Sequence, residues 1–420
     1  MSADSEVRRR IQERGKITFA EFMEVALYWP DGGYYTGQEP IGAQGDYYTS
    51  PAVHPAFGAL LSVQLFQMWQ ELGAPSPFTV LELGAGNGLL CRDITQYAEN
   101  LPGGFSAALR YICLDRRTPD SLEGGIPGTG RVQGEGLPFK VIEGCILSNE
   151  YLDAFPVHQV TMTRDGLKEV YVGLDAGELV ELTGEPSDPG LAGRLADLGI
   201  TLAGGQVAEV NLGLPRWSQE VADTLQRGFV LTIDYGRTAS DLYDPELRPK
   251  GTLVTYHQHL QTDAPLTRIG RQDITAQVDF TSAARAGERA GLETLGLVTQ
   301  REFLSHLNLE ILERYLGNHR LAPRQMRANR AGFLDLVRPG GLGDFKVLAQ
   351  VKNAGIPALW GLEHESDSRA IIGNLPAPLL TGQHLSLPDG RSFGGETECE
   401  AFWPFQDSNS SGEAETGTNK

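Results

Sequence analysis

The chain has 420 residues, of which 40% are hydrophobic and 21% are charged, and its formal net charge at pH 7 is −19. This length exceeds one average domain, so we expect a core domain with substantial additions. The acidic balance argues against nonspecific binding to nucleic acid, which relies on basic patches, and is compatible with a protein partner that carries a basic segment.

The sequence contains no apolar run long enough to span a membrane, and its first ten residues lack the apolar region of a secretory signal. Acidic residues lie among the arginines of this segment, which is not typical of a transit peptide, so we expect a cytoplasmic protein. The four cysteines form no C-x-x-C pair, and we expect reduced thiols and no metal site. No pattern indicates an oligomeric state.

The N-terminal segment combines helical periodicity with aromatic loops. Residues 7–27 have helical spacing of apolar side chains, and Thr18 precedes Glu21 at the spacing of a capping box. Two loops rich in glycine and tyrosine follow, at 28–35 and 45–51. Their aromatic side chains either pack against the core or form a lid over a ligand cleft.

The most informative stretch spans residues 80–90. After a predicted helix at 55–72, a short apolar run predicts a buried strand, and glycines then occupy alternate positions at Gly84, Gly86 and Gly88. An apolar segment compatible with a helix, at 89–101, completes the pattern. Strand, glycine turn and helix form the first unit of a nucleotide-binding α/β sheet, in which glycines let a ligand approach the backbone.

The glycine spacing narrows the choice of ligand. A dinucleotide fingerprint (G-x-G-x-x-G) would have its third glycine one position after Gly88, where the chain has Leu89. In addition, Glu82 lies on the strand just before the glycine turn. A carboxylate does not help to bind a pyrophosphate, whereas it suits the ammonium group of S-adenosylmethionine (SAM). The pattern resembles motif I of the class I SAM-dependent methyltransferases; a dinucleotide site and a turn without a ligand are the alternatives.

Two further predicted strands end in polar residues. The strand at 110–115 ends on Asp115, which is placed to accept hydrogen bonds from ribose hydroxyls. The strand at 141–150 ends with Asn149 and Glu150, and Asp153 follows shortly after. These three side chains are placed to meet the methyl acceptor or the methionine end of SAM. The alternative is that Asn149 or Asp153 only caps the following turn.

The remaining chain alternates between sheet and helix signals. Strands at 160–164, 167–174 and 179–183 and a helix at 190–198 are predicted to form an insertion. A helix at 216–226 precedes a core strand at 228–236, where Asp234 and Tyr235 reach the side of the ligand crevice. His257 and His259 could share one face of a strand, but no acid or cysteine cluster supports a metal.

The C-terminal third is expected to complete the sheet. We predict helices at 282–291, 300–316 and 321–336, strands at 293–298 and 345–351, and a final strand around Ala370. The serine-, glycine- and acid-rich tail at 406–420 is expected to be disordered.

Several stretches, in the same order along the chain, resemble the MidA-like family of methyltransferases, which includes the mitochondrial complex I assembly methyltransferase. Together they cover roughly residues 17–350. They are Phe19–Met23, Ala26–Tyr28, Gly32–Tyr35, Gly45–Pro51, Leu81–Gly88, Ser148–His158, Ile233–Gly236, Asp273–Thr275 and Val278–Phe280. The family usually has glutamate where Asp115 stands, and residues 353–420 lie outside the familiar pattern.

The resemblance implies an α/β fold, namely a Rossmann-like class I methyltransferase sheet with a helical and aromatic-loop N-terminal cap and an inserted β-rich subdomain. It also implies protein arginine N-methylation for the mitochondrial members. The corresponding division is a cap at 1–55, a core at 56–157 and 216–351, an insertion at 158–215, an extension at 352–405 and the tail.

Arginine methylation assigns roles to the candidate residues. A guanidinium is a poor nucleophile, so flanking carboxylates would orient it and take up its proton. Glu150 and Asp153 are the candidates, with Asn149 and His158 as auxiliaries. The residues expected to hold SAM are Glu82, Gly84, Gly86, Gly88, Asp115 and Asn149. The alternatives are a methyltransferase for a small molecule or another side chain, and a SAM-binding assembly chaperone.

Overall fold

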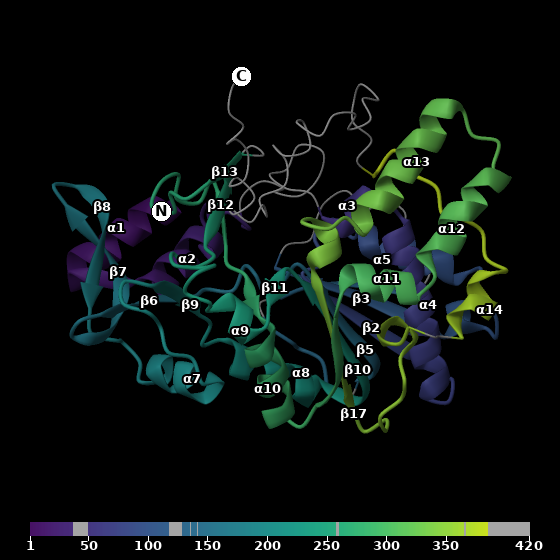
Figure 1. Cartoon of the computed structure of the whole chain (residues 1–420), viewed down its shortest axis with the longest axis horizontal. Coiled ribbons are helices and arrows are strands. Elements are labelled where there is room, and N and C mark those ends of the chain that lie inside the picture. Colours follow the sequence, from purple (N-terminus) through teal and green to yellow (C-terminus); the bar gives the residue numbers. More distant parts are fainter. Residues whose placement is uncertain are drawn as a thin grey trace, which may run out of the picture.

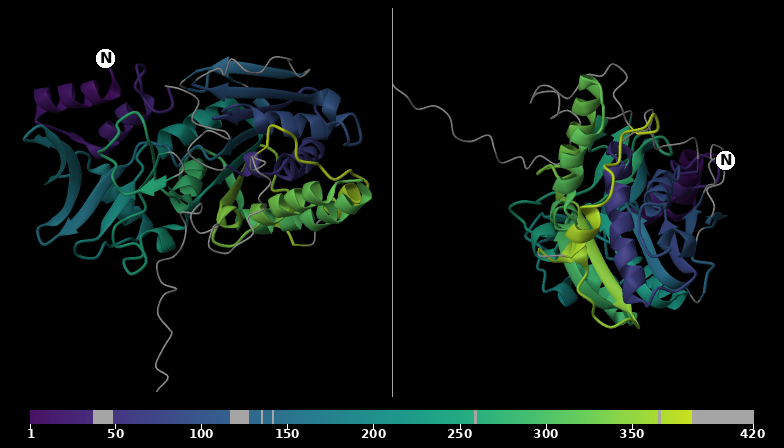
Figure 2. Two further views of the ribbon diagram at one scale, coloured as in Figure 1. Left: turned by 90° about the horizontal axis from the view of Figure 1, so that it is seen from above. Right: turned by 90° about the vertical axis from the view of Figure 1, so that its right-hand side faces the viewer.

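The computed structural model describes residues 1–36, 49–116, 128–134, 136–140, 142–257, 260–364 and 367–384. The two largest β-sheets of the described residues, each with its helices, lie side by side (Figures 1 and 2). The larger unit holds a seven-stranded sheet between helices, and the smaller unit holds a five-stranded antiparallel sheet beside the N-terminal helices. The predicted disordered tail at 406–420 lies outside the described residues.

The seven-stranded sheet has the order β16-β17-β10-β5-β2-β3-β4. The five strands from β10 to β4 run parallel, whereas β16 and β17 are antiparallel to their neighbours. Among the parallel strands the chain order runs outward from β2 on both sides, first through β3 and β4 and then through β5 and β10, whereas β17 inserts between β10 and β16. The carboxyl ends of β2 and β5 therefore flank a topological switch point, where ligands bind in such sheets. The strands are β2 (Phe78–Leu83), β3 (Leu109–Asp115), β4 (Thr129–Gln133), β5 (Ile142–Asn149), β10 (Leu225–Asp234), β16 (Glu293–Thr299) and β17 (Lys346–Lys352).

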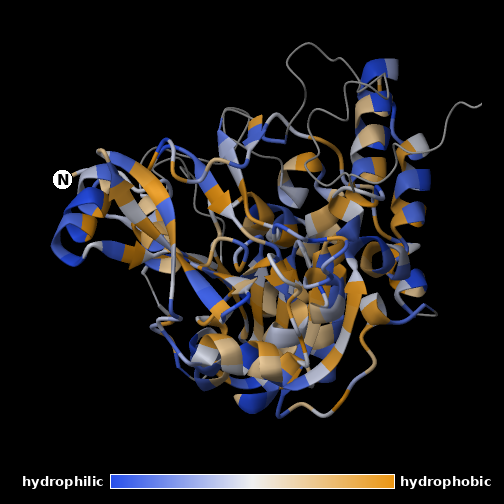
Figure 3. Ribbon diagram, turned by 60° about the vertical axis from the view of Figure 1, so that its left-hand side comes forward, coloured by the Kyte–Doolittle hydropathy of each residue, from blue (hydrophilic) through white to orange (hydrophobic). Residues whose placement is uncertain are grey.

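Helices cover both faces of this sheet, and the strands between them are mainly hydrophobic (Figure 3). On one face lie α4 (Ala56–Glu71), α5 (Leu89–Ala98), α11 (Gln300–His306), α12 (Leu309–Tyr315) and α13 (Pro323–Leu336). On the other lie α8 (Leu214–Thr224) and α10 (Phe280–Arg289). The α4 helix is buried nearly all round, because α5 covers it on one side and the C-terminal segments on the other.

The five-stranded sheet contains the predicted hairpin and third strand. Strand β7 pairs with β6, β8 and the N-terminal strand β1, and β6 also pairs with β9. The bounds are β1 (Lys16–Thr18), β6 (His158–Thr163), β7 (Gly166–Asp175), β8 (Glu178–Gly184) and β9 (Val207–Val210). Helix α7 (Gly190–Leu198) confirms the helix predicted there. The division into domains given above stays a prediction.

Shorter elements connect the two sheets and complete the chain. The helices among them are α1 (Ala3–Arg14), α2 (Phe19–Tyr28), α3 (Ser50–Val53), α6 (Phe105–Ala108), α9 (Ala239–Leu242) and α14 (Ser368–Ile372). The strands are β11 (Gly236–Arg237), β12 (Val254–His257), β13 (Leu260–Thr262), β14 (Asp273–Thr275) and β15 (Val278–Asp279). Three 3-10 turns are Leu316–Asn318, Leu342–Asp344 and Trp360–Leu362.

Two secondary-structure predictions for the C-terminal part are wrong. The segment around Ala370 forms the helix α14 and not a strand. The helix predicted at 300–316 is interrupted between α11 and α12. The interruption occurs at Asn308, whose φ of 61° lies in the left-handed region and cannot continue a right-handed helix.

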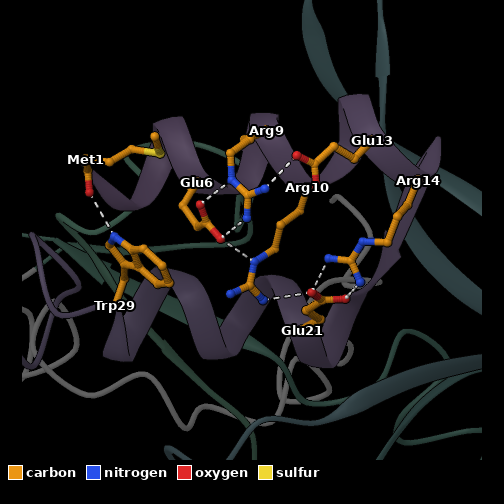
Figure 4. A network of polar contacts seen from close by, with 8 residues as sticks. All are labelled: Met1, Glu6, Arg9, Arg10, Glu13, Arg14, Glu21 and Trp29. Atoms are coloured by element: carbon orange, nitrogen blue, oxygen red, sulfur yellow. Dashed lines mark hydrogen bonds and ion pairs between the residues drawn. The ribbon is translucent and has the colours of Figure 1, made fainter.

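A network of arginines and glutamates joins α1 to α2 (Figure 4). Glu6 is 2% exposed and accepts hydrogen bonds from Arg9 and Arg10 at 2.7–2.8 Å. Arg10 also donates to Glu21 of α2 at 2.7 Å. The bonds from Arg9 and Arg10 lower the pKa of Glu6 from 4.5 to about 2. The arginines near the N-terminus therefore hold the two helices together.

The network predicts an acid-sensitive contribution to stability. Because the pKa of Glu6 is lower in the folded chain, its contribution is present above about pH 4.5 and is lost as the pH falls toward 2. Glu6→Gln is expected to lower the free energy of unfolding at neutral pH, and its difference from the parent should shrink on acidification. Denaturant unfolding at several pH values measures this. Glu13→Gln, which removes a single exposed bond to Arg9, is the control, and a constant difference would contradict the prediction.

Candidate functional site

The carboxyl ends of β2, β3 and β5 open into a cavity of about 660 Å³. Its wall also includes residues of α2, α3, α5 and α8. The predicted site residues that line it are Glu82, Gly84, Gly86, Asp115, Asn149 and Glu150. Gly88, Asp153 and His158 are not part of its lining. The cavity therefore lies at the switch point of the sheet and collects residues from both sides of it.

The glycine turn needs its glycines for two reasons. Gly84, Gly86 and Gly88 have φ values of 68°, 51° and 75°, in the left-handed region. A Cβ on Gly84 would lie 2.6 Å from the ring of Tyr151. Gly88 lies at the N-cap of α5, so it shapes the turn from outside the cavity lining. The bare backbone of the turn faces the cavity and is open to a ligand.

Glu82 is a buried carboxyl group in the cavity wall. It is 3% exposed, and its Oε2 accepts a hydrogen bond from the Tyr111 hydroxyl at 2.9 Å. Burial raises the pKa of Glu82 well above its ordinary value. A cationic group that binds beside it would favour the charged carboxylate and offset the cost of burial.

Asp115 lies at the end of β3, on the other side of β2 from Glu150. Its Oδ2 accepts a hydrogen bond from the backbone N–H of Gly86 at 2.9 Å. This bond fixes the glycine turn against β3, and the carboxylate remains part of the cavity wall. Asp115 is therefore placed both to shape the turn and to meet a hydroxyl-bearing ligand.

Two buried polar atoms of the cavity-lining residues have no hydrogen-bond partner within the described ranges. They are the indole Nε1 of Trp217 on α8 and the amide Oδ1 of Asn149. A buried polar atom without a hydrogen bond lowers the stability of the fold, unless a ligand or a water molecule bonds to it. Together with the two acids and the glycine turn, they fit a ligand that has ammonium, hydroxyl and aromatic groups, as SAM does. Sequence reasoning missed Trp217, since its spacing on α8 is that of an ordinary core residue.

Glu150 directly follows β5 in an unusual backbone conformation. Its φ of 51° is rare for a residue with a side chain, and its N–H donates to Ile233 O at 2.9 Å. The side-chain Oε1 accepts hydrogen bonds from Asn149 Nδ2 at 3.0 Å and from Ser50 N at 3.3 Å. Burial, followed by the charge of Asp234, raises the pKa of Glu150 to about 8. The carboxyl group can therefore change its protonation state near neutral pH.

Asp234 fixes the turn that contains Glu150. Asp234 Oδ2 accepts hydrogen bonds from the N–H groups of residues 151–153 at 2.8–3.4 Å. Its Oδ1 accepts one from Tyr235 N at 2.9 Å. Burial raises the pKa of Asp234 to about 7, although these backbone donors favour the charged form. The sequence predicts that Asp234 reaches the side of the ligand crevice. In the structure its carboxylate caps the backbone N–H groups of the turn.

Asp153 lies behind Glu150. It is 8% exposed, and burial, followed by the charges of Asp234 and Asp273, raises its pKa well above the ordinary value. None of the salt bridges between described residues involves Glu150, Asp153 or Asp234. Three buried carboxyl groups therefore lie next to the cavity without a described cationic partner. Burying charge in this way is unfavourable in a protein interior.

Replacing Asp234 tests its role in the turn. Asp234→Asn places an amide where four backbone N–H groups donate, so we expect a loss of about 1–3 kcal/mol in the free energy of unfolding. We also expect the activity of the site to fall, because Glu150 is no longer fixed. Asp223→Asn, at an exposed position of α8, is the control. Stability and rate equal to those of the control would refute this role.

His158 lies away from the cavity, on β6 of the five-stranded sheet. Its Nδ1 lies 2.7 Å from Oε1 of the fully buried Glu169. The auxiliary role predicted for His158 therefore has no support in its position. The pair instead connects β6 to β7, whose register brings the two residues close together.

The first aromatic loop contacts the rim of the cavity. Tyr28 stacks on Tyr35 with ring centroids 5.6 Å apart, and the Tyr28 hydroxyl donates to Ala154 O at 2.8 Å. The Tyr35 hydroxyl donates to Asp273 at 3.0 Å. Most of the second loop, at 45–48, lies outside the described residues. Whether the loops move as a lid stays a prediction.

The described residues contain no group of histidine, cysteine and acidic side chains that would hold a metal ion. His257 lies on β12, and its Nδ1 is 2.8 Å from Arg271 O, while its neighbour His259 is not described. In the part of the chain that the structure describes, no helix is long and apolar enough to cross a membrane.

Known proteins resemble both the sequence and the structure. A family model described as S-adenosyl-L-methionine-dependent methyltransferase matches residues 60–120 and 131–298. The mitochondrial protein arginine methyltransferase NDUFAF7 homologue of Drosophila melanogaster is 28% identical over 83% of this chain and 84% of its own length. The human protein arginine methyltransferase NDUFAF7 is 26% identical over 80% of each chain.

Solved structures of bacterial proteins agree with this result. A Burkholderia thailandensis protein bound to S-adenosylhomocysteine (SAH) superposes with a TM-score of 0.74 and 27% identity, covering 86% of this chain and 94% of that one. A second structure from the same organism gives a TM-score of 0.73 at 26% identity and covers 88% of this chain and 96% of that one.

The comparisons also correct one prediction. Each of the curated relatives named above is a mitochondrial protein. The cytoplasmic location inferred from the N-terminal segment is therefore wrong. The inference rested on acidic residues near the N-terminus, and these instead serve the network that joins α1 to α2.

Proposed function

The chain belongs to the family of S-adenosyl-L-methionine-dependent methyltransferases that matches it at residues 60–120 and 131–298, and on this premise we propose that it methylates arginine side chains of a protein substrate. The observation that carries the proposal is the group of buried carboxyl groups at the cavity, led by Glu150. The names of the curated relatives, which are protein arginine methyltransferases, support the same acceptor.

The geometry of the glycine turn supports a cofactor site beside it. SAM supplies a methyl group on a positively charged sulfur. In the proposed arrangement Glu82 accepts hydrogen bonds from the ammonium group, and Asp115 accepts them from the ribose hydroxyls. The backbone of Gly84–Gly86 allows close approach. Trp217 Nε1 and Asn149 Oδ1 are further groups that a bound molecule can satisfy.

The end of the cavity at Glu150, where the methyl acceptor is proposed to bind, suits a cation. Glu150 lines the cavity, and its Oε2 accepts no hydrogen bond from the described residues. Asp153 and Asp234 add negative charge behind it as they ionise. A guanidinium placed against Glu150 would form a charge-assisted pair and offset the cost of the buried carboxylates. Glu150 is the direct contact in this proposal, and Asp153 acts through the charge of the group.

Glu150 is also suited to take up a proton. A guanidinium nitrogen must lose its proton to become a good nucleophile, and a base helps most when its pKa is near the working pH. The pKa of Glu150, about 8, meets this condition. The carboxylate would hold the guanidinium in line with the methyl group and accept the proton as the bond forms.

Carboxylates also attract other cationic acceptors, so the proposal needs a chemical test. The protein is incubated with SAM that carries a labelled methyl group and with a protein extract, and the labelled protein is hydrolysed to amino acids. We expect label in methylated arginine, and Asp223→Asn should give the same product. Label in another amino acid or only in small molecules would favour the other acceptors. SAM binding without turnover would favour an assembly chaperone.

A further inference from the structure

The stretch 373–384 near the C-terminus lies outside the segments that match the family model, yet it is fixed to the methyltransferase core. The Tyr97 hydroxyl on α5 donates to Pro376 O at 2.9 Å. The backbone N–H of Leu380 donates at 3.0 Å to Oδ1 of Asn329, a buried residue of α13. The stretch therefore has a defined path across α5 and α13 (Figure 1).

The stretch ends in a buried hydrogen-bonded pair. His384 Nε2 lies 2.9 Å from Asp93 Oδ2, and the two residues are 3% and 7% exposed. The backbone N–H of Thr381 donates to Nδ1 of His384 at 3.2 Å. Because Nδ1 accepts a hydrogen bond, Nε2 carries the proton and donates to Asp93. Hydrogen bonds at both ring nitrogens therefore fix the orientation of the His384 ring.

The partner of His384 belongs to the helix that starts at the glycine turn. Leu89, Asp93 and Tyr97 follow one another at intervals of four on α5, so they share one face of the helix. Leu89 lines the cofactor cavity, and the other two hold the C-terminal stretch. Gln383, next to His384, also lines the cavity. The stretch thus extends the cavity wall beyond the start of α5.

The position of this wall indicates which part of the cofactor it meets. Asp115 and Glu150 lie at the ends of β3 and β5, on opposite sides of β2. A ribose held by Asp115 therefore directs the amino-acid end of SAM toward Glu150. Helix α3 packs against α5, and its Ser50 N–H donates to Glu150. The part of the cavity wall formed by the C-terminal stretch on α5 accordingly lies beside the amino-acid end of a bound SAM.

We propose that the C-terminal stretch contributes to SAM recognition: Gln383 contacts the amino-acid end of the cofactor, and His384 is a positioning residue that holds Gln383 there through Asp93. This inference rests on the SAM-dependent activity of the family and is independent of the methyl acceptor. An amide group suits the amino-acid end, which bears both a carboxylate and an ammonium group.

Calorimetry with two ligands tests the proposal. SAH contains the amino-acid end, and 5′-methylthioadenosine lacks it. For Gln383→Ala in the full chain we expect SAH affinity to fall about 3- to 10-fold, the value of one hydrogen bond, with little change for methylthioadenosine. Gln383 is exposed, so this variant should fold normally. Unchanged SAH affinity, or equal losses for both ligands, would overturn the assignment.

The positioning role of His384 has its own readout. His384→Ala should raise the KM for SAM about tenfold with a smaller effect on kcat, because Gln383 is no longer held beside the cofactor. His384→Gln, which keeps a donor for Asp93, should restore most of the affinity. Tyr315→Phe is the control, since the Tyr315 hydroxyl donates to Gly373 O at the far end of the stretch. Equal KM values in His384→Ala and the control would overturn the role.

Discussion

Replacing Glu150 with glutamine is expected to lower kcat for methyl transfer by about 10²–10⁴-fold, the range for a general base, while SAH still binds. Glutamine keeps the size of the side chain and can still accept from Asn149 and Ser50. It loses the negative charge that holds a guanidinium and the ability to take its proton. Steady-state kinetics with labelled SAM and calorimetry with SAH measure the two properties separately.

The pH dependence gives an independent check on the same residue. Since the base must be deprotonated, and the pKa of Glu150 in the free protein is about 8, kcat/KM of the parent should rise with pH and level off above about 8. The residual rate of Glu150→Gln should lack this rise. Glu143→Gln changes a partly exposed residue at the other end of the same strand and serves as the control. Full activity in Glu150→Gln would remove Glu150 from the mechanism.

Replacing Glu82 with glutamine is expected to weaken SAM binding by about 10- to 100-fold, the value of a hydrogen bond to a charged group. The fold should persist, because the buried side chain keeps its shape and can still accept from Tyr111. Tyr111→Phe removes only that hydroxyl and should have a smaller effect on affinity.

SAM binding should also release a proton. Burial raises the pKa of Glu82 well above its ordinary value, so burial favours the neutral carboxyl group in the free protein. An ammonium group beside it favours the carboxylate. Calorimetry in two buffers of different ionisation enthalpy should detect the proton in the parent and not in Glu82→Gln. Equal affinity of parent and variant, with no buffer effect in either, would exclude Glu82 from the cofactor site.

The centre of the site could be predicted because its signals are local. The glycines at 84, 86 and 88 and the acids that end two buried strands are readable from spacing and strand ends alone. The parallel arrangement of the strands then brings Glu82, Asp115 and Glu150 to one edge. No packing detail is needed for that inference, since it follows from the topology of the sheet.

The sequence missed features that depend on distant partners. Strand β4 has little apolar character, because it lies at the edge of the sheet and, among the described strands, pairs only with β3. His158 looked like part of the site because it follows the Asn149–Asp153 segment closely, yet the chain enters the second sheet there. Asp234 accepts hydrogen bonds from the N–H groups of residues 151–153, and His384 pairs with Asp93, so each of these contacts joins groups more than 80 residues apart. Such contacts have no periodic signature.

A crystal structure of the complex with SAH would test most directly whether one cavity brings the cofactor and the acceptor carboxylate together. We expect the SAH amino group to lie within hydrogen-bond distance of Glu82, and the ribose hydroxyls to lie within that distance of Asp115. We also expect the sulfur to face Glu150 across a space open to an acceptor. SAH bound with its sulfur turned away from Glu150, or with its ribose remote from Asp115, would contradict this arrangement.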